Sequence, residues 1–226
     1  MKIESTSIEG DGFRVPLIRI APMDPVGAAV VVHGYGGCKE EQLGLAWRVA
    51  ETGLLTDCID LRGHGDHELP FDKTVLEDVE AAVAAASRSG KVVAIGHSLG
   101  GRLSLASSAD FAIGISPPLD VTYGERTEEL LRKLRSHKVR LESERTVFDV
   151  IENLPKLEGR ASGNLMIIYG SRDIPEIVRA CERLNGSTGN VLRVEGAMHS
   201  DTYLMPATFE GIANRLANWF PRPHRA

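Results

Sequence analysis

The stretch Val92-Val93-Ala94-Ile95-Gly96-His97-Ser98-Leu99-Gly100-Gly101 decides how this chain is expected to fold. Its first four residues predict a buried strand, and residues 99–109 have the small and apolar residues typical of a closely packed helix. The glycines two before and two after Ser98 remove side chains that would clash in a sharp strand-to-helix turn. Such a turn strains the serine backbone and presents its hydroxyl beside the free N–H groups of the helix start. The pattern indicates a nucleophilic serine and acyl transfer; an ordinary glycine-lined turn is the alternative.

Strand-like and helix-like segments alternate on both sides of this stretch. We expect strands at residues 2–8, 13–21, 28–33, 55–60, 92–95, 111–115, 165–169 and 191–194, and helices at residues 40–52, 75–87, 99–109, 175–184 and 208–220. The first two strands form a hairpin across Gly10-Asp11-Gly12. Alternation of strands and helices is the signature of a parallel sheet with helices on both faces. The predicted fold class is therefore α/β, with a mostly parallel twisted sheet.

Two of these helices carry apolar stripes that predict which face is buried. The stripe of residues 40–52 is Leu43, Ala46, Trp47 and Ala50. The stripe of residues 208–220 is Ile212, Leu216, Trp219 and Phe220. Both stripes are expected to pack against the sheet.

Residues 119–156 interrupt the alternation. They predict two short amphipathic helices, at residues 125–136 and 146–154. We expect a single domain over residues 1–226 in which 119–156 form a short helical cap over the carboxyl ends of the strands, where open α/β sheets bind ligands. A long plain connection is the alternative.

The inner face of this cap is predicted from its apolar residues, which are Leu130, Leu131, Leu134, Val147, Phe148 and Ile151. Phe148, Leu134 and the loop residue Met198 are predicted to contact substrate in a pocket of modest depth. In the alternative interpretation, the cap residues pack against the main core and never meet substrate.

Composition narrows the classes of function. The formal net charge of −5 over 226 residues lacks the basic footprint of a nucleic-acid-binding protein. No apolar run approaches membrane-spanning length, and residues 1–5 do not resemble a signal peptide. Three widely spaced cysteines predict reduced thiols and a cytoplasmic location. No Cys/His spacing resembles a zinc site. A reaction through a serine nucleophile implies neither a metal nor an organic cofactor, so none is expected. The oligomeric state is not predicted.

A nucleophilic serine needs a base within hydrogen-bond reach, and a carboxylate must orient that base. In this architecture the order along the chain is serine, acid, histidine. His199 follows a predicted strand in a Gly-Ala-Met-His-Ser turn at the correct edge of the sheet. His137 lies in the charged cap segment and His224 in the Pro-Arg-Pro-His-Arg tail. His199 is therefore the predicted base.

Asp173 is the predicted acid, because it follows the strand at residues 165–169. Asp120 and Asp149 are the competing acids. Asp173 also precedes a helix opened by Pro175, so its structural alternative is an N-cap of that helix. The two roles compete for one carboxylate.

Two backbone N–H groups are predicted to stabilise a developing oxyanion. One belongs to Leu99, which follows the nucleophile. The other belongs to Tyr35, in the His33-Gly34-Tyr35-Gly36-Gly37 loop, where glycines let the backbone approach substrate. His33 is expected to brace this loop. The alternative interpretation of this segment as a glycine-rich phosphate-binding loop is excluded, because no Gly-Lys-Ser/Thr follows it.

These segments together resemble the α/β-hydrolase superfamily, and most of all its small microbial carboxylesterases and monoacylglycerol-lipase-like enzymes. The matching residues are His33-Gly34-Tyr35-Gly36-Gly37, Asp60-Leu61-Arg62-Gly63-His64-Gly65, Gly96-His97-Ser98-Leu99-Gly100-Gly101, Gly170-Ser171-Arg172-Asp173 and His199. The cap is shorter than in many members, so a relative's substrate choice does not transfer.

The resemblance implies a serine carboxylesterase with the triad Ser98, Asp173 and His199, acting on short- to medium-chain small-molecule esters. The same triad serves thioesterases, amidases or peptidases, acyltransferases and carbon–carbon bond hydrolases. A catalytically silent binding module on this fold is the alternative from another class.

Overall fold

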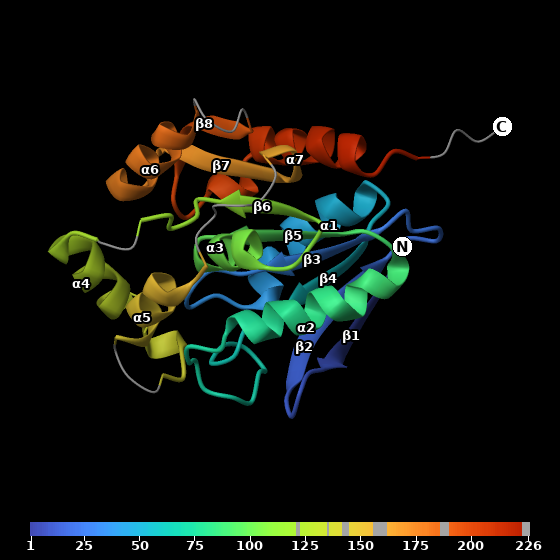
Figure 1. The fold of residues 1–226 in the computed structure, drawn as a ribbon, viewed down its shortest axis with the longest axis horizontal. Coiled ribbons are helices and arrows are strands. Elements are labelled where there is room, and N and C mark those ends of the chain that lie inside the picture. The colour runs from blue at the N-terminus through green and yellow to red at the C-terminus, as the bar shows by residue number, and fades with distance from the viewer. Residues whose placement is uncertain (121–122, 135, 142–144, 156–161, 186–189, 223–226) are drawn as a thin grey trace.

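The computed structural model describes residues 1–120, 123–134, 136–141, 145–155, 162–185 and 190–222. Their strands form an eight-stranded sheet in the order β1-β2-β4-β3-β5-β6-β7-β8 (Figure 1). The strands are β1 (Lys2–Glu9), β2 (Arg14–Ala21), β3 (Ala28–Val32), β4 (Leu55–Ile59), β5 (Val92–His97), β6 (Phe111–Ile115), β7 (Leu165–Arg172) and β8 (Val191–Met198). From β3 to β8 all pairings are parallel, while β2 runs antiparallel to both β1 and β4. The predicted mostly parallel sheet is confirmed.

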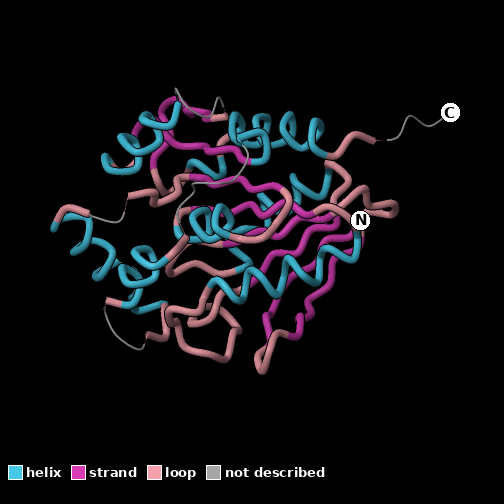
Figure 2. The backbone as a smooth tube through the Cα atoms, viewed as in Figure 1, coloured by secondary structure: helices cyan, strands magenta, loops and turns pink. Residues whose placement is uncertain are grey.

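Helices cover both faces of this sheet, as Figure 2 shows. The helices around the sheet are α1 (Leu43–Glu51), α2 (Leu76–Ala86), α3 (Leu99–Ala106), α6 (Pro175–Asn185) and α7 (Pro206–Trp219). Alternate residues of a strand point to opposite faces. Val30 and Val32 of β3 therefore join the core under α2 and α3, whereas Ala29 and Val31 join the core under α1 and α7. No helix of the described ranges is long and apolar enough to cross a membrane.

The predicted buried face of α1 was wrong at Trp47. The structure buries Leu45, Ala46, Val49 and Ala50 of this helix, while Trp47 is 37% exposed. The indole N–H of Trp47 donates to Glu51 at 3.1 Å on the outer surface. Leu45 and Val49 are smaller than Trp and fully apolar, so they fill the space against the sheet and leave the polar-edged indole outside.

Between β6 and β7 the described chain forms the helices α4 (Glu125–Leu134) and α5 (Thr146–Asn153), joined through a short 3-10 turn, η3 (Ser136–Lys138). Both predicted helices of this segment are present. Figure 1 shows them together at the end of the molecule opposite the N-terminus. The chain between them pairs with the loop after β4, because the Phe71 N–H donates to the Arg140 carbonyl at 2.8 Å and the Arg140 N–H donates to the Gly63 carbonyl at 2.9 Å.

Candidate active site

Ser98 occupies the sharp turn between β5 and α3. Its φ of 53° and ψ of −121° are unusual for a residue with a side chain. A Cβ on Gly96 would collide with the Gly100 carbonyl oxygen, and a Cβ on Gly100 would collide with the His33 carbonyl oxygen. Only glycine fits at either position. Leu99 is the first residue of α3, so its N–H has no partner within the helix and lies beside the serine.

The structure brings Ser98, His199 and Asp173 into one hydrogen-bonded chain. His199 Nε2 lies 3.0 Å from Ser98 Oγ, and His199 Nδ1 lies 2.8 Å from Asp173 Oδ1. An ionised carboxylate can only accept, so Nδ1 carries a proton and Nε2 is left to accept the serine proton. The three residues come from the carboxyl ends of β5, β7 and β8, which lie at one edge of the sheet.

Asp173 serves two partners through a single oxygen. Its Oδ1 accepts the Ile174 N–H at 2.7 Å as well as the His199 N–H. Burial alone would raise the pKa of Asp173, but the hydrogen bond and charge of His199, the Ser116 hydroxyl and the Ile174 N–H together lower it. The carboxylate therefore stays ionised at neutral pH. Because Ile174 precedes the first residue of α6, this bond is not an N-cap of the helix, and it leaves the role beside His199 unopposed.

The competing acids and bases occupy other places. Asp120 accepts a hydrogen bond from Arg183 at 2.6 Å near the surface. Asp149 lies on α5, and His137 is exposed in η3. His224 lies outside the described residues.

His97 supports His199 from behind, and its role was missed in the sequence. The His97 Nε2–H donates to the His199 carbonyl oxygen at 2.8 Å. Its ring lies 5.0 Å from the His199 ring and 4.6 Å from the Tyr203 ring, measured between centroids. His97 belongs to the motif around Ser98, but its contact spans 102 residues of sequence, which no local pattern reveals.

Two buried histidines hold the loop that carries Tyr35. His33 Nε2 accepts the Leu61 N–H at 3.1 Å, and its Nδ1–H donates to the Gly34 carbonyl at 2.8 Å. His64 Nε2 accepts the Gly36 N–H at 3.0 Å. The expected bracing by His33 is thus shared with His64, and the two rings are 4.9 Å apart.

Both histidines must be neutral to accept these N–H groups. Burial lowers the pKa of His33 to about 4. Burial and the neighbouring His33 lower the pKa of His64 to about 3. The loop with Tyr35 is therefore fixed by two imidazoles that resist protonation at neutral pH.

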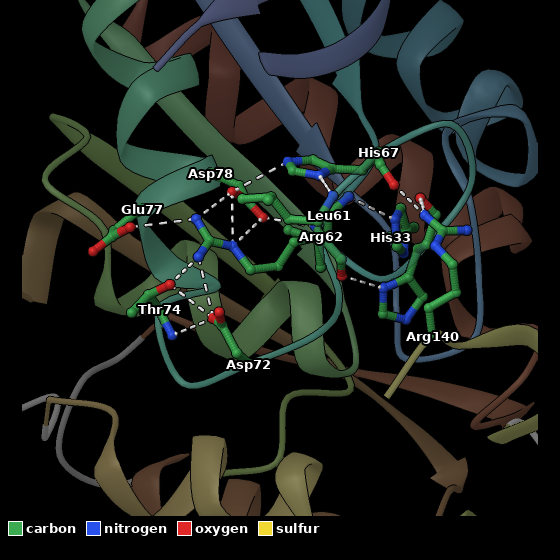
Figure 3. Close-up of polar contacts among 11 residues, drawn as sticks. His33, Leu61, Arg62, His67, Asp72, Thr74, Glu77, Asp78 and Arg140 are labelled. Atoms are coloured by element: carbon green, nitrogen blue, oxygen red, sulfur yellow. Dashed lines mark hydrogen bonds and ion pairs between the residues drawn. The ribbon is translucent and has the colours of Figure 1, made fainter. Parts of the chain in front are cut away.

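A buried charge cluster around Arg62 anchors the loop that holds His64 (Figure 3). The Arg62 guanidinium donates to Asp78 Oδ1 at 2.8 and 3.0 Å and to Asp78 Oδ2 at 3.2 Å, and also to Asp72, Thr74 and Glu77. His67 adds a ring nitrogen 3.4 Å from Asp78. Burial would raise the pKa of Asp78, but hydrogen bonds from His67 and Arg62 lower it.

The same loop is joined to the segment between α4 and α5. The Arg140 side chain donates to the carbonyl oxygens of His64, Gly65 and His67. Figure 3 shows the Arg62 cluster and Arg140 on opposite sides of this loop. Contacts therefore run from the Tyr35 loop through His64 to both α2 and the segment before α5.

Ser98 opens onto two cavities. The larger, of about 450 Å³, is lined by Gly34, Tyr35, Gly37, Glu41, Gln42, His97, Ser98, Thr127, Leu131, Arg172, Asp173, Ile174, Met198, His199, Ser200 and Tyr203. The smaller, of about 30 Å³, is lined by Tyr35, Ser98, Leu99, Pro118, Tyr123, Thr127, Leu131, Val147, Ile151, Ile174, Ile177 and His199. The smaller chamber is apolar except at the edge next to the serine and at Tyr123 and Thr127.

The predicted substrate contacts divide among different places. Met198 lines the larger cavity and is 44% exposed. Phe148 lines neither cavity; it is 5% exposed and packs into the core with α2 and α3, because it lies on the far side of α5. The prediction that Phe148 contacts substrate was therefore wrong. Its neighbours on α5, Val147 and Ile151, line the smaller chamber instead. The side chain of Leu134 lies outside the described residues. Gln42, Arg172 and Thr127 line the cavity but were not predicted.

Within the described part of the chain, no group of three or more His, Cys, Asp or Glu side chains is arranged to hold a metal ion. Cys38, Cys58 and Cys181 are free, and burial raises the pKa of Cys181 to about 12.

A model of the alpha/beta hydrolase family matches residues 29–161, more than half of the chain. The chain belongs to this family. A search of curated proteins finds no significant sequence match. Solved structures of the alpha/beta hydrolase fold resemble it closely in backbone, although their sequences differ widely.

Three of these structures show the range. An esterase from Pyrobaculum calidifontis is 18% identical with a TM-score of 0.67, and the match covers 96% of this chain and 84% of that one. Est1E from Butyrivibrio proteoclasticus is 17% identical with a TM-score of 0.67, covering 94% and 99%. An E-2-(acetamidomethylene)succinate hydrolase is 17% identical with a TM-score of 0.69, covering 95% and 99%. At such identities the likeness establishes the fold, and the protein is a hydrolase by family.

Proposed function

We propose that this hydrolase is a serine carboxylesterase that cleaves short-chain esters through an acyl-enzyme on Ser98. The observation that carries the proposal is the continuous chain from Ser98 Oγ to His199 and on to Asp173, at a strained turn beside the free N–H of Leu99. A serine with such a base and acid is the standard arrangement of nucleophilic catalysis.

In the first half of the reaction, Ser98 Oγ attacks the ester carbonyl carbon while His199 Nε2 takes the hydroxyl proton. The carbonyl oxygen becomes an oxyanion, which the N–H groups of Leu99 and Tyr35 stabilise. The bond from carbon to the alcohol oxygen then breaks, and His199 gives its proton to the departing alcohol. Asp173 keeps the imidazole in the tautomer that this step needs. Water, activated by His199, cleaves the acyl-enzyme by the same route.

The two cavities favour a small acyl group. His199 must reach the departing alcohol, and the loop with Met198 and Ser200 that carries it lines only the larger cavity. We therefore place the alcohol part there and the acyl chain in the smaller chamber, next to Leu99. The smaller chamber, at about 30 Å³, is far smaller than the larger cavity of about 450 Å³, so it favours acetyl and propionyl groups over longer chains. The medium-length chains of the sequence prediction would require Val147 or Ile151 to move.

Amide hydrolysis is a second candidate. One structural neighbour is named as the hydrolase of an acetamido compound, in which an acetyl group is joined to nitrogen. The same residues could cleave such a bond if His199 protonates the leaving nitrogen. Within the proposal, residues 119–156 act as a cap over the smaller chamber of a single domain that spans residues 1–226. We also propose a cytoplasmic location, in keeping with three unpaired cysteines.

The experiment measures hydrolysis of nitrophenyl acetate, butyrate and decanoate, together with the acetanilide and a thioacetate. We expect the acetate ester to be cleaved fastest. Ser98→Ala should lower kcat on the order of 10⁶-fold and abolish labelling by a fluorophosphonate. Ser89→Ala, an exposed serine remote from Ser98, is the matched control and should leave both unchanged. Fast anilide cleavage would favour the amidase. A protein that neither reacts with the fluorophosphonate nor turns over any substrate is a silent binding module.

A further inference from the structure

Gln42 lines the larger cavity and carries a buried polar group that no other part of the described protein satisfies. The residue is 2% exposed, and its Oε1 is buried without a hydrogen-bond partner. It lies at the end of the 3-10 turn η1 (Lys39–Gln42) and lines the cavity with Tyr35 and Ser98. A buried amide oxygen without a donor destabilises the protein, so a ligand that supplies a donor would recover that free energy.

Arg172 adds a positive charge to the wall of the same cavity. It ends β7, directly before Asp173, and its side chain is exposed. Among the described residues, no ion pair or hydrogen bond of its guanidinium occurs. The two acidic residues of the wall are already engaged, since Glu41 pairs with Lys138 at 3.3 Å and Asp173 pairs with His199. A guanidinium in this position suits a carboxylate, which it can bind through two N–H groups.

The two groups stand in the part of the site where the departing alcohol would lie. Neither residue lines the smaller chamber, whose wall is mainly apolar. A plain alkyl alcohol would leave the Gln42 amide unpaired and would bring nothing to Arg172. An alcohol part with a hydroxyl and a carboxylate would pair with both.

We infer that Gln42 and Arg172 form a subsite for the alcohol part of the substrate, and that this part is a polar hydroxylated carboxylic acid rather than an alkyl chain. The substrate class is thus a short-chain acyl ester of a dihydroxy carboxylic acid, in which one hydroxyl is esterified and the other is free. This inference rests on the proposed esterase activity. Gln42 accepts the hydrogen bond of a free hydroxyl, and Arg172 binds the carboxylate.

The test uses two pairs of aryl acetates that differ by one group. Meta-carboxyphenyl acetate and its neutral carboxamide report on Arg172, and meta-hydroxyphenyl acetate and its methoxy analogue report on Gln42. For the unaltered enzyme we expect kcat/KM to favour the carboxylate and the hydroxyl. Arg172→Gln should reduce the first preference about tenfold, and Gln42→Met should reduce the second about fivefold. Each variant should leave the other ratio within about twofold.

Arg193→Gln is the matched control for charge, because Arg193 is exposed on the neighbouring strand β8, pairs with Glu195 and lies outside the cavity wall. It should change neither ratio. Added salt should weaken the carboxylate preference of the unaltered enzyme but not that of Arg172→Gln. Ratios that stay unchanged in Arg172→Gln and Gln42→Met, or that fall equally in Arg193→Gln, would overturn the inference.

In that event, turnover of unsubstituted phenyl acetate shows whether the esterase proposal still stands, because this ester needs neither residue. Since Gln42→Met alters a buried site, its melting temperature is measured too, and Arg172→Gln at the surface supports or refutes the inference independently.

Discussion

The loop that carries Tyr35 and the helix α4 border the same cavity, but they are held in very different ways. The loop with Tyr35 is fixed by buried histidines, and the loop after β4 is fixed by the buried cluster of Arg62 and Asp78. By contrast, α4 meets α6 through Glu176, which accepts the Gly124 N–H at 3.3 Å and the Thr127 hydroxyl at 3.4 Å. Both of these hydrogen bonds are long, and the first is exposed. Among the contacts of the described residues, buried hydrogen bonds thus hold the candidate chemical groups, whereas Leu131 and two long hydrogen bonds hold α4 at the cavity rim.

Helix α5 resembles the firmly held loops rather than α4, because its apolar side chains are buried. Its residues Val147, Phe148, Val150 and Ile151 are buried in the same core as α2 and α3. The proposed cap therefore has one helix that is part of the core and one that borders the opening. We therefore predict that substitutions in the triad, the buried histidines or α5 strongly alter the reaction rate or the stability. Substitutions that affect only the contacts of α4 should alter them little.

Among the changes that test this comparison, the largest effect is expected at Asp173. Asp173→Asn keeps the shape of the side chain but permits the wrong histidine tautomer, so kcat for nitrophenyl acetate should fall on the order of 10⁴-fold. Asp120→Asn is the matched control, since Asp120 pairs with Arg183 near the surface. If the control lost as much activity as Asp173→Asn, the acid would have to be reassigned.

Next in size is the contrast between two neighbours on α5. Phe148→Ala should lower the free energy of unfolding by about 3–5 kcal/mol, because a buried ring is removed from the core, and it should leave the ratio of butyrate to acetate hydrolysis unchanged. Ile151→Ala should raise that ratio several-fold, because Ile151 lines the smaller chamber. Urea unfolding and ester kinetics measure the two effects. A changed ratio in Phe148→Ala alone would place Phe148 in the site after all.

The two buried histidines predict how stability depends on pH. Their pKa values are about 4 and about 3 in the folded protein, against 6.5 for an ordinary histidine. At a pH between the folded and the ordinary pKa, each of these histidines is protonated in the unfolded chain but neutral in the folded protein. The free energy of unfolding therefore rises with pH in this range. The contribution is complete above about pH 6.5 and is lost as pH falls towards 4 and then 3, on the order of 3 kcal/mol for His33. Asp173 and Asp78, whose pKa values are lowered, act in the same direction at lower pH.

Urea unfolding at pH 5 and pH 7.5 measures this dependence. His64→Gln supplies an amide oxygen that can accept the Gly36 N–H without titrating, so it should flatten the dependence on pH. His137→Gln, at an exposed position, should leave the slope unchanged. If the free energy of unfolding depended equally on pH in the unaltered protein, His64→Gln and His137→Gln, the buried histidine His64 would not be the cause of the dependence.

How far the sequence predicts this molecule depends on how local each feature is. The turn at Ser98 is specified by glycines within two residues of it, and the strands by short apolar runs, so both could be predicted. His199 and Asp173 could be predicted because parallel strands end at one edge of a sheet. The support of His199 by His97, and of Gly36 by His64, joins residues 102 and 28 positions apart and leaves no local pattern.

The errors concern side chains whose direction depends on packing. Trp47 and Phe148 both lie on apolar stripes, and periodicity alone places an aromatic residue on a face about 100° wide. The neighbouring helices and strands decide whether a side chain on that face enters the core, lines a cavity or stays exposed. Gln42 and Arg172 were overlooked because a polar residue inside a helix or at a strand end carries no sign of an unpaired group until the cavity is seen.

The smallest effect is expected at the contact between α4 and α6. Glu176→Ala removes the acceptor for Gly124 and Thr127 and an acidic side chain from the first turn of α6. Long and exposed hydrogen bonds contribute little, so the free energy of unfolding should fall by less than about 1 kcal/mol. Because Ser98, His199 and Asp173 are held by other contacts, kcat/KM for phenyl acetate should change by less than about threefold. Glu182→Ala, an exposed acidic position later on the same helix, is the matched control for the loss of charge. Thermal unfolding and ester kinetics measure both quantities. A tenfold loss of kcat/KM in Glu176→Ala, without a matching loss of stability, would mean that the position of α4 is part of the chemistry and that the loosely held rim is not separable from the firmly held loops.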